Sequence, residues 1–336
     1  MNLYLGYESS LELVRYLRST GDGTIEGTSV RRGRLRNPLS SVHDLQSLDN
    51  TAEQWLSHVS RPIHAFVDKP ARQTKTSKLV THVWGPDVPN GTFVDIGHGI
   101  FISSAPALFL QLATVMDTAE LAFVGMELCG EYSSWHLPLG GMGDPLYTGY
   151  EENREYTYDL DRLTTRAKIE SYLVRNPGAR GAVKARAALK WVLDNAKSPM
   201  ETGVYLQLCL PRRLGGYGLP LPILNPKVTV GGAGSERVLS PDLFWKASGI
   251  DVEYNSDYAH SGEWNRHKDS KREVELVVSK VTVLPLTRTQ VMNVDEFDTF
   301  ATGLRKLMGI RARPLDAAWK ERRAALRAIT LPGATG

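Results

Sequence analysis

Four polar residues in the C-terminal half of the chain have types and spacing that could hold a metal ion. Asp242 follows Pro241 in one run of strand-forming residues, and Glu253 and Asn255 lie two apart in the next. Side chains alternate along a strand, so residues 253 and 255 point the same way, and a neighbouring strand would bring Asp242 beside them. Glu201 lies in the first turn of the preceding predicted helix.

Acids gathered on one face of a sheet raise each other's pKa unless a cation compensates their charge. Mg²⁺ (or Mn²⁺), bound by carboxylate and water oxygens, is the usual compensation. Such a cation polarises a phosphoryl oxygen and activates an attacking water, which is the chemistry of phosphodiester hydrolysis. Asp242 and Glu253 are the predicted metal ligands, and Glu201 is predicted to assist them.

The elements that must position these residues can be predicted from the pattern around them. Ser198 and Pro199 fit the N-cap and first position of a helix over 199–210. Downstream, the pattern predicts strands over 227–230, 237–245 and 249–255, a helix over 263–280, a strand over 281–286 and a helix from 293 to about 308. The order of the elements before the last helix is α-β-β-β-α-β.

This order and its polar residues resemble the PD-(D/E)XK nuclease superfamily, in the branch near the very-short-patch repair endonucleases. The resemblance covers residues 199–290 and is carried by Pro241-Asp242, Glu253-Tyr254-Asn255, His260, Arg266, Asp269 and Arg272. It extends to Pro285-Leu286-Thr287-Arg288-Thr289-Gln290-Val291, which is similar to the branch's apolar-Thr-x-x-Gln-Val signature. It implies a restriction-endonuclease-like αβββαβ core, with catalytic residues Glu201, Asp242, Glu253, Asn255 and His260.

One position departs from the family pattern. The superfamily has Lys two residues after its second acid, and the repair-like branch often has Asp, whereas this chain has Asn255. Asn is a poor general base at neutral pH. Asp257 shares the strand parity and could replace it, and Lys268 or Lys271 could supply a cation. The departure leaves three hypotheses open: an active endonuclease, a catalytically degenerate nuclease fold that regulates by binding DNA, and a protein-interaction module.

The first 195 residues are predicted to form a mixed α+β domain that binds DNA or a protein partner. Ser9-Ser10-Leu11-Glu12 reads as a capping box at a helix start. Short antiparallel strands are expected between 79 and 103, followed by helices over 104–112, 118–127, 161–173 and 181–195. Residues 81–132 resemble, more weakly, the C-terminal domain of the antitoxin regulators of abortive-infection type IV toxin–antitoxin systems. That likeness implies a role in phage defence or in a toxin–antitoxin system.

Basic residues are clustered, although the net charge is only +3. Clusters of this kind suit phosphate backbones, so DNA is the expected partner. The residues predicted to contact nucleic acid are Arg266, Lys268, Arg272, Arg322 and Arg323. The last two belong to a basic C-terminal helix or tail over 311–336, which follows the nuclease-like domain predicted over 196–310.

The remaining composition is ordinary: 42% of residues are hydrophobic and 23% are charged. Cys129 and Cys209 lie in apolar helical surroundings, which predicts two reduced core thiols. The chain shows no signal-peptide pattern at its first residues and no apolar run long enough to span a membrane. We therefore expect a cytoplasmic protein without membrane contact.

Overall fold

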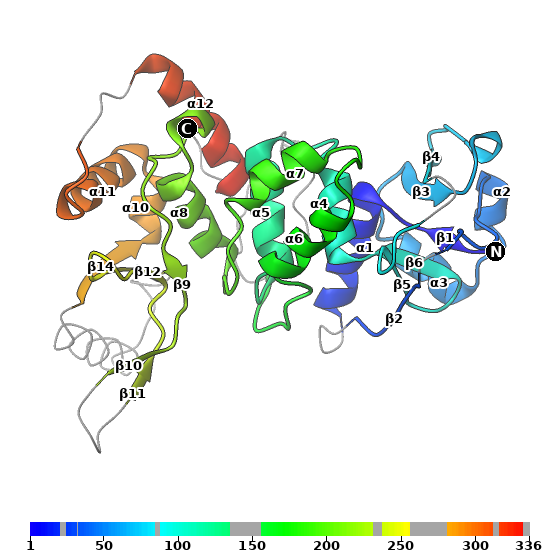
Figure 1. Cartoon of the computed structure of the whole chain (residues 1–336), viewed down its shortest axis with the longest axis horizontal. Helices are drawn as coiled ribbons and strands as arrows, with labels where there is room; N and C mark the ends of the chain where they lie inside the picture. The colour runs from blue at the N-terminus through cyan, green and yellow to red at the C-terminus, as the bar shows by residue number, and fades with distance from the viewer. Residues whose placement is uncertain are drawn as a thin grey trace. The chain divides into compact units, whose positions relative to one another are not determined.

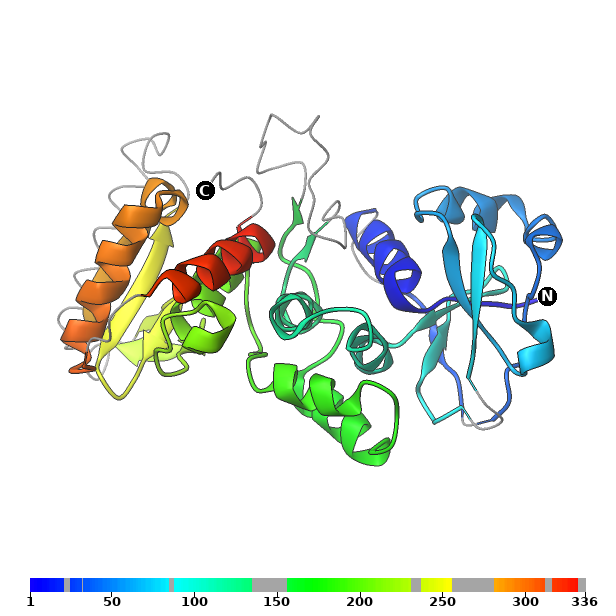
Figure 2. The same cartoon turned by 90° about the horizontal axis from the view of Figure 1, so that it is seen from above.

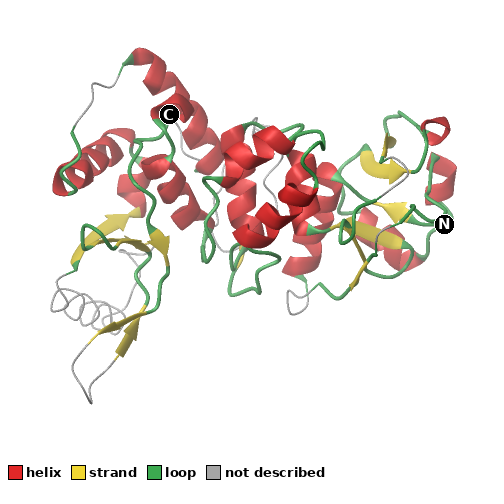
Figure 3. Ribbon diagram, viewed as in Figure 1, coloured by secondary structure: helices red, strands yellow, loops and turns green. Residues whose placement is uncertain are grey.

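The computed structural model divides the chain into two compact units, Met1–Val192 and Leu193–Gly336. It describes residues 1–20, 25–31, 33–84, 88–134, 156–230, 237–255, 281–311 and 316–331. Each unit contains both helices and strands (Figures 1 and 3), so the chain belongs to the mixed α/β class. Among the described residues, no helix has the length and apolar character that crossing a membrane requires.

Unit 1 is built on a four-stranded sheet with the order β1-β6-β5-β2. Strand β6 pairs in parallel with β1 and antiparallel with β5, and β5 pairs antiparallel with β2. Two further pairs stand beside this sheet, β3 with β4 in parallel and β7 with β8 antiparallel. The strands are β1 (Leu3–Tyr4), β2 (Thr28–Ser29), β3 (Ile63–Val67), β4 (Leu79–Val83), β5 (Phe93–Asp95), β6 (Ile100–Ser103), β7 (Ser133–Ser134) and β8 (Tyr156–Thr157).

The helices of unit 1 enclose an apolar core whose buried side chains include Leu3, Leu13 and Ile100. A buried ion pair links two of these helices: Arg15 of α1 donates from Nη2 to Oε2 of Glu127 of α5 at 2.6 Å. The helices are α1 (Tyr7–Ser19), α2 (Val42–Leu45), α3 (Asn50–Leu56), α4 (Ala105–Leu112), α5 (Thr118–Leu128), α6 (Arg166–Arg175) and α7 (Ala182–Leu189), with a 3₁₀ turn at Pro70–Arg72.

Two predictions for unit 1 are corrected by the structure. Helix α1 begins at Tyr7, with Gly6 as N-cap, so the capping box read at Ser9 is wrong. The hydroxyls of Ser9 and Ser10 instead lie inside the helix and accept backbone N–H groups from outside it. Strand β4 pairs in parallel with β3, a strand that the sequence reading missed, whereas β5 and β6 form the expected antiparallel pair.

Unit 2 contains a four-stranded sheet with the order β14-β13-β12-β9. Strand β12 pairs antiparallel with β9 and with β13, and β13 pairs in parallel with β14. A separate hairpin joins β10 to β11. The strands are β9 (Ile223–Leu224), β10 (Val228–Val230), β11 (Arg237–Leu239), β12 (Leu243–Trp245), β13 (Ile250–Asn255) and β14 (Thr282–Thr287).

The helices of unit 2 lie before and after these strands in the chain (Figure 2). They are α8 (Pro199–Cys209), α10 (Arg288–Met292), α11 (Val294–Leu307) and α12 (Ala317–Thr330), with a 3₁₀ turn at Arg212–Leu214. Helix α8 has Ser198 as N-cap and Pro199 in its first turn, which confirms the predicted helix start. Helix α11 likewise begins after Asn293, whose side chain accepts the N–H groups of Asp295 and Glu296.

The single strand predicted over 237–245 is two strands in the structure. Ser240 and Pro241 separate β11 from β12, and a proline lacks the N–H that a continuous ladder would need. The run at 228–230 belongs to the hairpin, and β9 takes its place in the four-stranded sheet. The predicted helix over 263–280 lies outside the described residues. Both cysteines are buried thiols, as expected.

Helix α12 packs directly on α8. A methyl group at Gly203 of α8 would clash with the backbone carbonyl oxygen of Thr330 of α12, so the two helices approach as closely as a glycine allows. Trp319 and Leu326 of α12 are buried. The C-terminal segment, predicted as a separate basic helix or tail, therefore contributes to the core of unit 2.

Candidate functional site

The register of the four-stranded sheet aligns the predicted metal ligands. Leu243 pairs with Val252 of β13 and with Leu224 of β9. Extended by one residue, these ladders set Asp242 opposite Glu253 on one side and opposite Asn225 on the other. Residues opposite each other in antiparallel strands share one face of the sheet. Asp242 and Glu253 therefore belong to the same face, whereas Asn225, whose φ is +46°, has left the strand conformation.

Backbone hydrogen bonds hold this alignment. The N–H of Tyr254 donates to Oδ2 of Asp242 at 3.0 Å, and the N–H of Asn225 donates to the carbonyl of Asp242 at 3.1 Å. Glu253 is buried, with 9% of its surface exposed, and Asp242 is half-buried. The structure thus brings together two of the acids that the sequence singled out.

Glu201 of α8 is the third acid, and it is 6% exposed. Its Oε2 accepts hydrogen bonds from Nδ2 of Asn225 at 2.8 Å and from the N–H of Lys197 at 3.1 Å. Burial, together with the nearby charge of Asp242, raises the pKa of Glu201 from 4.5 to about 7, although the hydrogen bonds and the charge of Lys197 oppose the rise. Near neutral pH this carboxyl therefore exchanges a proton readily.

Three residues of this region were missed by sequence reasoning. Asn225 adopts a left-handed backbone with φ +46°, which Asn tolerates better than most residues. Lys197 donates from Nζ to Oγ of Ser240 at 3.4 Å, two residues before Asp242. Asp251 is fully buried and shares its strand parity with Glu253. The parity argument applied to residues 253 and 255 could have found Asp251, but no sequence signal pointed to Asn225 or Lys197.

Asn255 ends β13 and pairs in register with Thr287 of β14. It is half-buried and shares the parity of Glu253. The next residues explain the Thr-x-x-Gln signature physically. Thr287 accepts the N–H of Gln290 at 3.3 Å, and the side chain of Gln290 accepts the N–H of Thr287 at 3.0 Å, which is a capping box at the start of α10.

The acids do not form a ready three-ligand metal cage. Within the ranges that the structure covers, no group of three or more His, Cys, Asp or Glu side chains is arranged to hold a metal ion. Mg²⁺ is commonly held by one or two carboxylates with water and substrate oxygens. Asp242 and Glu253, aligned on one face with buried Glu201 nearby, fit that simpler ligand set.

Several predicted site residues cannot be placed. His260, Arg266, Lys268 and Arg272 lie outside the described residues, and so do the proposed substitutes Asp257 and Lys271. Their predicted roles stay predictions.

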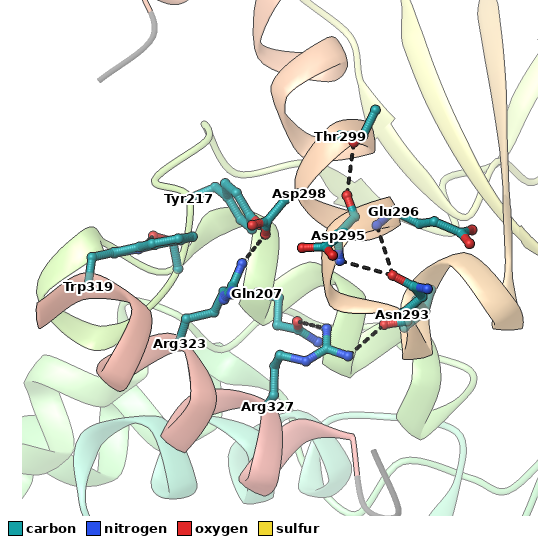
Figure 4. Close-up of polar contacts among 12 residues, drawn as sticks. Gln207, Tyr217, Asn293, Asp295, Glu296, Asp298, Thr299, Trp319, Arg323 and Arg327 are labelled. Carbon is teal, nitrogen blue, oxygen red and sulfur yellow. Dashed lines mark hydrogen bonds and ion pairs between the residues drawn. The ribbon is translucent and has the colours of Figure 1, made fainter. Parts of the chain in front are cut away.

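The structure separates the two arginines predicted in the C-terminal helix. The side chain of Arg322 is 42% exposed, and its Nη2 lies 4.0 Å from the carboxylate of Asp316, at the limit of an ion pair. Arg323 is buried, pairs with Asp298 of α11, and lies over the ring of Trp319 at 4.9 Å (Figure 4). Arg323 therefore has a structural role, and its predicted contact with phosphate is corrected.

Arg327 ties α12 to the helix that carries Glu201. It donates to Oε1 of Gln207 in α8 at 3.2 Å, and to the carbonyls of Val291 and Met292 at 3.0 and 2.8 Å (Figure 4). Burial lowers the pKa of Arg327. Its guanidinium donates to carbonyls at the end of α10, as basic side chains commonly do at helix C-termini. The position of α8 therefore depends on α12.

Comparison with known proteins found no match for this chain. No family of known proteins, no curated protein and no solved structure matches the chain.

Proposed function

We propose that unit 2 is a metal-dependent nuclease-like domain that hydrolyses phosphodiester bonds of DNA. The observation that carries this proposal is the hydrogen bond from the N–H of Tyr254 to Oδ2 of Asp242, which sets Asp242 beside Glu253, while the negative charge of Asp242 raises the pKa of buried Glu201. The order α8, β9, β12, β13, β14, with β13 and β14 parallel, is compatible with an αβββαβ nuclease core.

The charge of the site supports a divalent cation as its ligand. A buried carboxyl whose pKa rises to about 7 beside a second acid is a group whose negative charge lacks full compensation. Asp242 and Glu253 would hold Mg²⁺ or Mn²⁺. The bound cation would supply Lewis acidity toward a phosphoryl oxygen and acidify a water molecule.

The chain's own residues have separate parts in this proposal. Glu201 holds or releases a proton near neutral pH, and the amide of Asn225 orients its carboxyl. Lys197 supplies a positive charge beside Glu201 from the loop before α8. In this proposal, Lys197 supplies the compensating positive charge for which the sequence suggested Lys268 or Lys271.

A second function is favoured by Asn255. An amide at that position provides neither the family's lysine nor a further carboxylate, and the described acids form no three-ligand set. These features support a nuclease fold that binds DNA without cutting it and acts as a regulator. The resemblance of residues 81–132 to antitoxin regulators supports a place in phage defence or in a toxin–antitoxin system for either function.

Cleavage and binding assays on the same purified protein distinguish these functions. We expect nicking or cutting of supercoiled and linear DNA with Mg²⁺ or Mn²⁺, and none with EDTA. Asp242→Asn and Glu253→Gln should each abolish cleavage, because each removes a metal ligand. Glu296→Gln, which neutralises an exposed acid of α11 in the same unit, is the matched control and should retain activity.

Salt dependence of DNA affinity completes the test. Affinity that falls steeply with salt, without cleavage in any metal, would support the regulatory function. Absence of both cleavage and salt-dependent binding would contradict both functions and favour a protein-interaction module.

A further inference from the structure

A polar pocket in unit 1 lies outside everything proposed for unit 2. Its volume is about 470 Å³, which is within the range of small-molecule sites. Hydrogen-bonding and charged side chains dominate its lining. Its lining includes Tyr7, Glu8, Glu12, Arg61, His64, His82 and Arg180.

Two histidines form a hydrogen-bonded dyad in this lining. His64 of β3 and His82 of β4 lie on neighbouring parallel strands, and Nδ1 of His64 is 3.0 Å from Nε2 of His82. Burial, with the charges of His64 and Arg180, lowers the pKa of His82 to about 4, so that ring is neutral at physiological pH. A neutral imidazole offers one N–H donor and one acceptor nitrogen.

Tyr7 is held beside the dyad in a costly backbone conformation. Its φ is +53°, a left-handed value that is uncommon for a bulky residue. The side chain of Gln111 accepts its N–H at 3.1 Å, and its ring lies 4.5 Å from the ring of His82. Strained residues of this kind cluster at ligand-binding sites.

Two arginines and two glutamates line the pocket, so their formal charges balance. Among the residues that the structure describes, neither Arg61 nor Arg180 pairs with a carboxylate. Arg180 precedes Gly181, whose φ is +88° and where an added methyl group would meet Thr114. Helix α1 also begins here without a side-chain cap, which adds the partial positive charge of a helix start.

The two acids of the lining each have another favourable interaction. Glu12 accepts the N–H of Ser60 at 2.8 Å, so one of its oxygens is already engaged. Glu8 lies in the first turn of α1, where the helix dipole favours an acid.

We propose that this pocket binds a phosphate monoester of about nucleotide size, with Arg61 and Arg180 pairing with the phosphate and Tyr7 and the histidine dyad contacting the remainder. Guanidinium groups match phosphate oxygens in bidentate geometry, and an aromatic ring beside them suits a planar group. A metal ion is the less favoured ligand, because the facing nitrogens of the two histidines are already hydrogen-bonded to each other. No larger cluster of ligating side chains is found there among the described residues.

Isothermal titration calorimetry on the full chain tests the proposal, with AMP, inorganic phosphate and adenosine as probes. We expect AMP to bind more tightly than phosphate, and adenosine to bind far more weakly than AMP. Arg61→Gln and Arg180→Gln should each weaken AMP binding by about tenfold, the effect of losing one charge-assisted hydrogen bond. Both side chains are exposed, so the variants should keep the thermal unfolding temperature of the wild type.

Lys190→Gln removes an exposed charge of the same unit away from the pocket and should leave AMP binding unchanged. Equal binding of adenosine and AMP would overturn the proposal. So would wild-type affinity in the double arginine variant, or no binding of any phosphate at millimolar concentration. Zinc binding that depends on His64 and His82, without phosphate binding, would replace the proposed ligand with a metal ion.

Discussion

Nδ2 of Asn225 donates a 2.8 Å hydrogen bond to Oε2 of Glu201, joining the start of α8 to the strand edge that carries Asp242. The same Asn225 donates its backbone N–H to the carbonyl of Asp242. One uncharged residue thus contacts the carboxyl of Glu201 through its side chain and the backbone of Asp242 through its N–H.

Replacing Asn225 by glycine should weaken unit 2 by about 1–3 kcal/mol, because a buried carboxyl loses its donor while glycine keeps the left-handed backbone. The loss should grow as Glu201 ionises at higher pH. Urea unfolding measures it. Asn37→Gly is the matched control, since Asn37 is exposed with φ +45° and should tolerate the change. Equal losses in both variants would show that the backbone, not the amide, is responsible.

Glu201 should make unit 2 less stable as pH rises. Its folded pKa, about 7, exceeds the ordinary value of 4.5, so its contribution is fully present below about pH 4.5 and is lost as pH rises through about 7. That shift corresponds to about 3 kcal/mol. Glu201→Gln should flatten the profile of unfolding free energy against pH. An unchanged slope in the variant would assign the pH dependence to other groups.

Gly203→Ala should destabilise unit 2 by about 1–3 kcal/mol, because its methyl group would overlap the carbonyl of Thr330 and force α8 and α12 apart. The control is Gly303→Ala in α11, where the added methyl group meets no atom within 4 Å. There the better helix propensity of alanine should stabilise by up to about 1 kcal/mol. Thermal unfolding of the two variants should therefore move in opposite directions.

Arg322 and Arg323 should respond oppositely in two assays. Arg323→Gln leaves Asp298 without its buried partner and should lower the unfolding temperature while barely changing DNA affinity per folded molecule. Arg322→Gln loses the hydrogen bond from Nε to the carbonyl of Arg212 and should lower stability by only about 0.5–1.5 kcal/mol. It should reduce the salt dependence of DNA binding if this exposed arginine contacts phosphate. A fall in the DNA affinity of folded Arg323→Gln, with no such fall in Arg322→Gln, would contradict the structural role of Arg323.

In unit 1, Arg15→Met should cost about 3–5 kcal/mol, because Glu127 would stay buried without its cation. The double variant Arg15→Met/Glu127→Leu should recover most of that stability. Chemical denaturation of the single and double variants gives the coupling energy. Additive losses would show that the pair is not coupled.

How far the sequence predicts this structure depends on whether a signal is local. Ser198, Pro199 and Asn293 mark their helix starts correctly, because an N-cap acts within one turn. Ser9 misleads, because its hydroxyl serves a strand elsewhere in unit 1, and no local pattern encodes that partner. Pro241 divides one predicted strand into two for a local reason that could have been weighed.

The candidate site shows the same division. Strand parity and register placed Asp242 and Glu253 on one face, and the same argument reaches Asp251. The contact of Asn225 with Glu201 depends on how α8 packs against the end of β9, so it is tertiary and invisible in a single sequence. The contact of Lys197 is local, because its N–H meets the carboxyl of Glu201 four residues later. The predicted phosphate contact of Arg323 was wrong because the sequence shows the charge of this residue but not its burial.

The close packing of α12 on α8 has a consequence for how the protein is made. Helix α8 ends at Cys209 and α12 begins at Ala317, so at about 5–20 residues per second the ribosome needs roughly 5–20 s to supply the partner of α8. During that interval Gly203 and Gln207 face no partner helix, and α8, which carries Glu201, lacks its contacts with α12. Until α12 is made, a nascent chain that already contains Asp242 and Glu253 therefore lacks the helix that holds α8 in place.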